Sequence, residues 1–202
     1  MLTIWGRLNS HNVKKVAWFA EEIGIPYVRH DIGGKFGMDA AYLAKNPNAL
    51  IPTIEDSEVV LWESNAILRY LAAQYAPHLW PSDPAARARA DKWMDWQFSY
   101  ADAQRDAFVN LVRRAPDVRD MDAVQQSAMA CAKQMAILEG HLAEVPWLSG
   151  ERFGIGDIPM GVYAHTWFSL AIDRPDLPHV GDWYARLKTR DGFAGQVMIP
   201  LT

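Results

Sequence analysis

The stretch NPNALIPTIEDSEVVLWESNAIL, residues 46–68, organises the predicted fold of this chain. Residues 51–55 are predicted to form a strand, Asp56-Ser57 a turn, and residues 59–62 a second strand. A proline cannot donate a hydrogen bond to a β-ladder, so Pro52 must stand at the start or the edge of its strand. The stretch therefore predicts a hairpin.

The end of this stretch predicts a helix that follows the hairpin directly. Glu63-Ser64-Asn65 opens an apolar-periodic segment, and Ser64 is a residue type that caps helices well. A helix N-terminus attracts anions, because its free N–H groups and its dipole both favour negative charge. By itself the unit is better interpreted as a plain supersecondary element that binds nothing.

Composition limits the class of protein. The chain has 202 residues, half of them hydrophobic, which suits one large domain or two small ones. Its 20 Lys and Arg against 24 Asp and Glu give a net charge of −4, so the basic footprint of a nucleic-acid binder is missing. The nine tryptophans indicate aromatic-rich packing or an apolar binding groove.

The sequence does not indicate a metalloprotein, a disulfide-stabilised protein or a membrane protein. The single cysteine, Cys131, excludes an internal disulfide framework and a thiolate zinc cluster, and the six histidines lack paired ligand spacing, so no metal site is expected. The chain enters a strand at residue 2 without a basic leader, and no apolar run reaches the roughly 18–20 residues of a membrane span. We expect a soluble, cytoplasmic protein.

The residues before the hairpin alternate between strand and helix patterns. Residues 2–6 and 26–31 are predicted as strands, and a helix runs between them from a cap-like Ser10-His11-Asn12 to Gly24. A glycine loop at 33–37 and a short helix from Asp39 follow. With the hairpin and its helix, the order is βαβαββα, which implies a mixed sheet with helices on its faces.

The second part of the chain is predicted to be all-helical. Three prolines between Ala76 and Pro84 indicate a linker, and beyond it no convincing strand pattern is found. Helical spacing covers residues 85–114, 122–142, 157–172 and 180–189. The predicted division is an α/β domain at 1–78, a linker at 79–84 and an all-helical domain at 85–202.

This layout resembles the glutathione transferase superfamily, whose first domain is a thioredoxin fold. The likeness covers essentially the whole chain, and one large bacterial branch is the most similar. The residues that carry it are Asn46-Pro47, Ile51-Pro52, Glu63 to Ile67, Trp93 to Gln97, Leu111 to Arg113, Gly154 to Asp157 and Val197 to Thr202.

The resemblance implies that the hairpin and its helix bind glutathione. Ile51-Pro52 would be a cis peptide, whose Ile51 backbone groups pair with the cysteinyl backbone of glutathione as an added strand. Glu63 would bind the ammonium of the γ-glutamyl end, and Ser64 would donate to its carboxylate, together with the helix N-terminus.

The same resemblance places the partner of the glutathione sulfur between the first strand and the first helix. Ser10 aligns with the Cys or Thr of bacterial classes, and Asn12 with an Asn that some of them use. Lowering a thiol pKa by about two units from roughly 8.5 takes about 2.7 kcal/mol, and one hydrogen bond to a charged acceptor supplies about 1.5–3 kcal/mol. Simple N-capping is the alternative for both residues, and His11 is a further candidate.

Two departures from the family pattern affect the expected site. Some relatives carry Gln or Lys two residues before the cis proline, where this chain has Leu50, so Lys35 in the glycine loop is a candidate for binding the glycine carboxylate. A solvated loop lysine is the alternative. Gly154 replaces the Ser or Thr of a capping box that keeps its Asp157, which is expected to weaken a stabilising device.

The resemblance also implies a second substrate, a small electrophile, bound against the helical domain. The candidate lining residues, for each of which a core role is the alternative, are Tyr100, Gln104, Phe108, Arg113 and Trp167. The expected activity is a glutathione S-transferase, with glutathione as co-substrate, no other cofactor, and a homodimeric assembly. A glutathione-dependent disulfide-bond oxidoreductase and a catalytically idle binding module remain alternatives.

Overall fold

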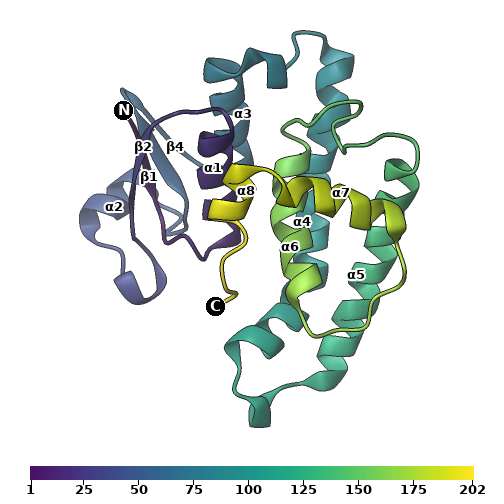
Figure 1. Ribbon diagram of the computed structural model, residues 1–202. Coiled ribbons are helices and arrows are strands. Elements are labelled where there is room, and N and C mark those ends of the chain that lie inside the picture. Colours follow the sequence, from purple (N-terminus) through teal and green to yellow (C-terminus); the bar gives the residue numbers. More distant parts are fainter. The chain divides into compact units, whose positions relative to one another are not determined.

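The computed structural model describes residues 1–202, and the chain divides into two compact units (Figure 1). The first comprises Met1–Pro84 and Arg190–Ile199, and the second Ala85–Thr189 and Pro200–Thr202. The helical unit thus begins where the predicted linker ends. The segment Arg190–Ile199 differs from the sequence-based division, which assigned it to the helical domain.

The first unit contains the four-stranded mixed sheet that the sequence predicts. Its strands are β1 (Leu2–Trp5), β2 (Tyr27–His30), β3 (Thr53–Asp56) and β4 (Val59–Trp62). In the order β2-β1-β3-β4, β2 runs parallel to β1, whereas β3 runs antiparallel to both β1 and β4. The parallel pair needs a crossover, which the first helix supplies.

The helices of this unit complete the βαβαββα order. They are α1 (His11–Glu22), the 3₁₀ turn η1 (Gly34–Phe36), α2 (Ala40–Lys45), α3 (Ser64–Tyr75), the 3₁₀ turn η2 (Pro77–Leu79) and α8 (Asp191–Gln196). α1 and α3 cover one face of the sheet and α2 lies on the other (Figure 1). The α/β thioredoxin-like class is confirmed, while η1 occupies a segment that was expected to be a loop.

Helix α8 was not predicted, because its six residues are too few to establish a helical period. It is held on α1 by side-chain contacts rather than by its own propensity. Phe193 meets the Trp18 ring edge-on at 4.9 Å, and Arg190 pairs with Glu22. A side chain on Gly192 would come within 3.0 Å of Trp18, so glycine permits the close approach of the two helices.

Helix α1 is buried from Val13 to Ala20, including Lys14 and Lys15. β1, α3 and α8 all pack against it, so several faces are covered. Gly6 allows the preceding loop to lie close to this helix, because a Cβ there would come 2.5 Å from a Val13 methyl carbon. This packing fixes the position of the loop that carries Ser10.

The second unit is helical. Its elements are α4 (Pro84–Phe108), the π-helical turn η3 (Val109–Arg113), the 3₁₀ turn η4 (Pro116–Val118), α5 (Met121–Leu142), α6 (Asp157–Ser169) and α7 (Pro178–Lys188). The predicted helix at 85–114 is therefore α4 followed by a π-helical turn. No helix of the chain combines the length and the apolar character that crossing a membrane requires.

The turn before α6 is organised by the buried carboxylate of Asp157. Its Oδ1 accepts hydrogen bonds from the Leu148 N–H at 2.8 Å and the Trp183 indole N–H at 2.9 Å. Its Oδ2 accepts from the N–H groups of Gly154 at 3.0 Å and Ser149 at 3.3 Å. Burial raises the pKa of this carboxyl, and the donors around it act in the opposite direction.

The hydroxyl that the sequence lacks at position 154 is supplied by Ser149. Its Oγ accepts from the Gly156 N–H at 3.1 Å. A Cβ on Gly154 would come 2.8 Å from both Cβ and Oγ of Ser149, so the glycine makes room for this serine. The expected weakening of the capping device is thus offset by a residue that lies outside the motif.

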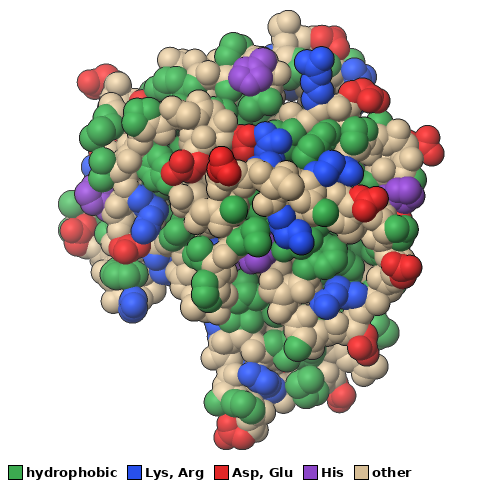
Figure 2. All heavy atoms as spheres, in the orientation of Figure 1, with side chains coloured by type: hydrophobic (Ala, Val, Ile, Leu, Met, Phe, Trp, Pro, Cys, Tyr) green, Lys and Arg blue, Asp and Glu red, His purple; other side chains and the backbone are tan.

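Acidic and basic side chains are interspersed over the face of the molecule in Figure 2. Neither sign forms a continuous patch on that face. This agrees with the small net charge of −4.

Candidate functional site

A small pocket of about 40 Å³ in the first unit brings together much of the predicted site. It is lined by Asn12, Asn46, Asn48, Leu50, Ile51, Pro52, Glu63 and Ser64. The predicted members among these come from three separate segments of the sequence. The asparagines at 46 and 48 were not predicted as site residues.

The loop before β3 is held by hydrogen bonds from α2 and from the residue that follows it. The Tyr42 hydroxyl and the Asn46 amide both donate to the Leu50 carbonyl, and the Asn46 amide also donates to Thr53 Oγ at 3.1 Å. Ile51 lies between these anchored residues and outside the ladder, which begins at Thr53. The Ile51-Pro52 bond is cis, as the resemblance implied.

Helix α3 begins in an unusual conformation. Glu63, with φ 72° and ψ 108°, is its N-cap residue, and the Glu63 side chain makes no capping hydrogen bond. The prediction that Ser64 is the cap was wrong, because the turn out of β4 is made one residue earlier. A non-glycine residue at positive φ costs about 1–3 kcal/mol, and such strain clusters at functional sites.

Ser64 connects α3 to α1. Its side chain is buried, and its hydroxyl donates to Asn12 Oδ1 at 3.3 Å. The same Oγ accepts a hydrogen bond from the Lys15 ammonium at 3.4 Å. The first residue of one helix and the second residue of another thus meet at the pocket.

Lys15 is the functional candidate that sequence reasoning missed. Its side chain is 0% exposed, and its ammonium also donates to Asn65 Oδ1 at 3.5 Å. Burial lowers the pKa of Lys15 to about 7, and the Glu63 carboxylate acts in the opposite direction. The available signal was a lysine flanked by Val13, Val16 and further apolar residues within a helix that has to be covered.

The two candidate partners of a thiol are placed differently. Ser10 occupies the N-cap position of α1, but its side chain makes no capping hydrogen bond, so the capping alternative has no support for it. Ser10 does not line the pocket, whereas Asn12 does. Because Asn12 Oδ1 accepts from Ser64, its amide nitrogen is the group directed elsewhere.

The other two predicted glutathione ligands lie outside the pocket lining. His11 is half-buried at the first position of α1. Lys35 is exposed on η1, with its ammonium 5.1 Å from the centre of the Phe36 ring. Neither of them lines the pocket that Glu63 and Ser64 line.

Most of the predicted second-substrate residues are buried in the second unit. Gln104 donates to the Tyr100 hydroxyl at 3.2 Å, and both side chains are almost fully covered. Phe108 and Trp167 are also buried. Arg113 is exposed and lies with its guanidinium 5.0 Å from the Phe108 ring centre.

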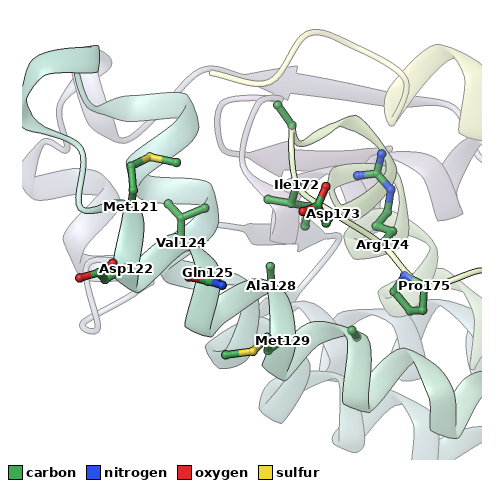
Figure 3. Close-up of a pocket in the computed structure, with 12 residues that line it drawn as sticks. Met121, Asp122, Val124, Gln125, Ala128, Met129, Ile172, Asp173, Arg174 and Pro175 are labelled. Atoms are coloured by element: carbon green, nitrogen blue, oxygen red, sulfur yellow. The ribbon is translucent and has the colours of Figure 1, made fainter.

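A larger pocket of about 710 Å³ lies elsewhere in the second unit, between α5 and the segment after α6 (Figure 3). Met121, Val124 and Met129 supply apolar groups from α5, and Arg174 is a charged group on the opposite side. None of the five predicted second-substrate residues lines it.

Comparison with known proteins gives a consistent result. The family model for the N-terminal domain of glutathione S-transferases matches residues 9–74. Glutathione S-transferase GstB of Escherichia coli is 43% identical over 208 residues, which cover 100% of both chains. The crystal structure of a theta class glutathione S-transferase of Xanthomonas axonopodis pv. citri, with glutathione bound, is 48% identical with a TM-score of 0.96, covering 100% of this chain and 99% of that one.

A more distant relative has a different activity in its name. The disulfide-bond oxidoreductase YfcG of Escherichia coli is 27% identical, with 93% of this chain and 90% of that protein covered.

Proposed function

The chain belongs to the glutathione S-transferase family and is a glutathione transferase, and from this premise we propose how its residues bind glutathione and activate the thiol. In the proposal the small pocket of the first unit takes the γ-glutamyl end of glutathione. The cysteinyl backbone lies along Ile51, and the sulfur points to the start of α1.

One observation carries the γ-glutamyl assignment: Glu63 and Ser64 line the pocket together at the start of α3, where the N-cap side chain makes no capping hydrogen bond. A zwitterionic amino-acid head group needs one carboxylate and several N–H or O–H donors. Glu63 supplies the carboxylate for the ammonium, and the Ser64 hydroxyl and the helix N-terminus supply donors for the carboxylate.

The thiolate is stabilised by Ser10 or Asn12 at the start of α1. A hydrogen bond to a charged acceptor is worth about 1.5–3 kcal/mol, which is the size of a two-unit shift in thiol pKa. Two observations support this role: the Ser10 side chain makes no capping hydrogen bond, and Asn12 lines the pocket. Titrating the thiol of bound glutathione in Ser10→Ala and Asn12→Ala decides between them, because the donor's loss raises that pKa.

Three further features of the proposal come from the family and not from the pocket. The conjugated partner is a small electrophile bound against the helical unit, near Tyr100, Gln104, Phe108, Arg113 and Trp167. Lys35 and His11 complete the glutathione contacts, Lys35 at the glycine carboxylate. The protein acts in the cytoplasm as a homodimer.

The variant Ser64→Ala tests the proposed γ-glutamyl contact. It should raise the KM for glutathione about tenfold, as loss of one charge-assisted hydrogen bond predicts, and leave the KM for the electrophile unchanged. An unchanged KM for glutathione would remove Ser64 from the site.

A second candidate function is glutathione-dependent disulfide reduction, which the likeness to YfcG favours. A glutathione thiolate would attack a disulfide to give a mixed disulfide and a free thiol, and a second glutathione thiolate would then release glutathione disulfide. The lone Cys131 is buried, and burial raises its pKa to about 11, so this route relies on glutathione alone. Parallel assays with a chlorodinitroarene and with a small disulfide separate the two activities, and failure in both without retention on a glutathione column would indicate an idle module.

A further inference from the structure

Lys15 is a fully buried lysine that none of the proposed contacts to glutathione uses. It lies on α1, which packs against α3. Its ammonium donates to Ser64 Oγ at 3.4 Å and to Asn65 Oδ1 at 3.5 Å, both within the first turn of α3. Burying an ammonium group is costly, so an apolar side chain of similar length would fill this position at lower cost on packing grounds alone.

The neighbouring lysine provides an internal contrast. Lys14 is also buried on α1, but its ammonium donates to the Val197 carbonyl at 3.1 Å, in the segment after α8. Its bond fastens the C-terminal segment of this unit. The two adjacent buried lysines therefore bind different segments of the chain. Of the two, only Lys15 donates to a side chain that lines the pocket.

The hydrogen bonds at Ser64 form a directed chain. Its hydroxyl oxygen accepts from the Lys15 ammonium, and its proton is donated to Asn12 Oδ1, which also lines the pocket. A hydroxyl that accepts a hydrogen bond from a cation becomes a stronger donor itself, because the bonds polarise one another. A carboxylate bound at Ser64 would accept this proton in place of Asn12 Oδ1, while Ser64 Oγ goes on accepting from the Lys15 ammonium.

We propose that Lys15 is a positioning residue for the γ-glutamyl carboxylate of glutathione, acting through the Ser64 hydroxyl. It fixes that hydroxyl as a donor and, in its protonated form, places a positive charge behind it. Together, Glu63 and Lys15 give the pocket a pair of charges that matches a zwitterion. Glu63 contacts the ammonium directly, and Lys15 acts on the carboxylate through the Ser64 hydroxyl. The inference rests on the proposed function, since it needs the γ-glutamyl end to lie at Ser64.

The test compares two ligands that differ only in this carboxylate. One is S-methylglutathione, whose blocked sulfur keeps the thiol chemistry out of the measurement. The other is the S-methyl peptide in which 4-aminobutyrate replaces the γ-glutamyl residue, which keeps the ammonium and lacks the carboxylate. Calorimetric titration gives the Kd of each ligand for the wild type and for Lys15→Met, Lys15→Gln and Lys15→Arg.

Lys15→Met should weaken S-methylglutathione roughly tenfold, the size of a lost contribution to a charge-assisted hydrogen bond. The Kd of the decarboxylated peptide should change less than twofold. Lys15→Gln, which keeps a donor but no charge, should behave like Lys15→Met and carries the prediction if the Met variant does not fold. Lys15→Arg should recover most of the affinity, and the matched control Lys14→Met should leave the ratio of the two Kd values as in the wild type.

Equal weakening of both ligands in the Lys15 variants would mean that Lys15 only supports the fold, and no weakening would mean that it has no role. Either result overturns the inference while the proposed glutathione site stands. If the wild type itself bound the two ligands equally, the carboxylate contact at Ser64 would be wrong, and the premise would fail with the inference.

Discussion

Two turns of this protein lead into helices and are built in opposite ways. The turn before α6 satisfies its polar groups internally: Asp157 accepts four hydrogen bonds, and Ser149 accepts the N–H of Gly156. In the turn before α3, Glu63 has a φ of 72°, its side chain makes no capping hydrogen bond, and the turn lines a pocket.

The turn before α6 is thus a helix start that stabilises the fold, whereas the turn before α3 is a helix start that can bind a ligand. Donors that are saturated by a buried carboxylate are not available to any other anion. Where a cap is missing and the backbone is strained, the helix start keeps donors for an external partner, at a cost in stability. Substitutions in the turn before α6 should therefore change the free energy of unfolding. Substitutions in the turn before α3 should change the affinity for glutathione.

The largest effect is expected for Asp157→Ala. Its removal leaves three backbone N–H groups and the Trp183 indole without their acceptor, and each buried unsatisfied donor costs about 1–3 kcal/mol. The free energy of unfolding should fall by about 4 kcal/mol or more in denaturant titration. Asp122→Ala, at an exposed position in the first turn of α5, is the control and should stay within about 0.5 kcal/mol of wild type. Similar small losses in both variants would contradict the structural role of this turn.

Glu63→Gln should have the next largest effect, and on binding. The amide keeps the shape of the side chain but loses the charge that pairs with the γ-glutamyl ammonium, an interaction worth about 1.5–3 kcal/mol. The Kd of S-methylglutathione should rise at least about tenfold in a calorimetric titration, with the unfolding midpoint nearly unchanged. A lower unfolding midpoint with unaltered affinity would mean that Glu63 stabilises the fold and does not bind glutathione. The turn before α3 would then have the same role as the turn before α6.

Gly154→Ala tests the packing of the turn before α6. The new Cβ would lie 2.8 Å from Cβ and Oγ of Ser149, and overpacking of this kind costs about 1–3 kcal/mol. The double variant Ser149→Gly with Gly154→Ser removes the clash and moves the hydroxyl to the position expected from the capping box. Its loss of stability should be smaller than the sum of the two single losses, because the residues are in contact. Simple additivity in the denaturation experiment would mean that the two positions are independent.

The sequence predicted the parts of this molecule that depend on local pattern or on family motifs. The βαβαββα order, the cis Ile51-Pro52 bond and the long helices of the second unit belong to this group. What it missed depends on contacts between distant segments. α8 exists because Phe193 and Arg190 find partners on α1, and neither partner can be inferred from six residues.

The candidate site shows the same division. The motif residues Ile51, Glu63 and Ser64 meet in one pocket, as expected. Lys15 was missed because a lysine on a helix is normally solvated, and its burial follows from the packing of α1 against neighbouring elements. The exchange of Ser64 for Glu63 as the cap residue depends on one backbone angle, which residue type does not determine for a glutamate.

The smallest change in stability is expected for Glu63→Gly. Glycine adopts positive φ without the steric cost that a Cβ imposes, so the folded state gains about 1 kcal/mol from relief of strain at φ 72°. Part of this gain is offset because glycine also has more freedom in the unfolded chain, and the net increase in unfolding free energy should be about 0.5 kcal/mol. At the same time the variant loses the carboxylate, so glutathione affinity should fall as far as in Glu63→Gln. A protein that is slightly more stable and binds glutathione poorly is the combination expected if this strain is retained for function. A variant that loses stability would show instead that Glu63 makes contacts that hold α3 in place, and the contrast with the turn before α6 would then be one of degree.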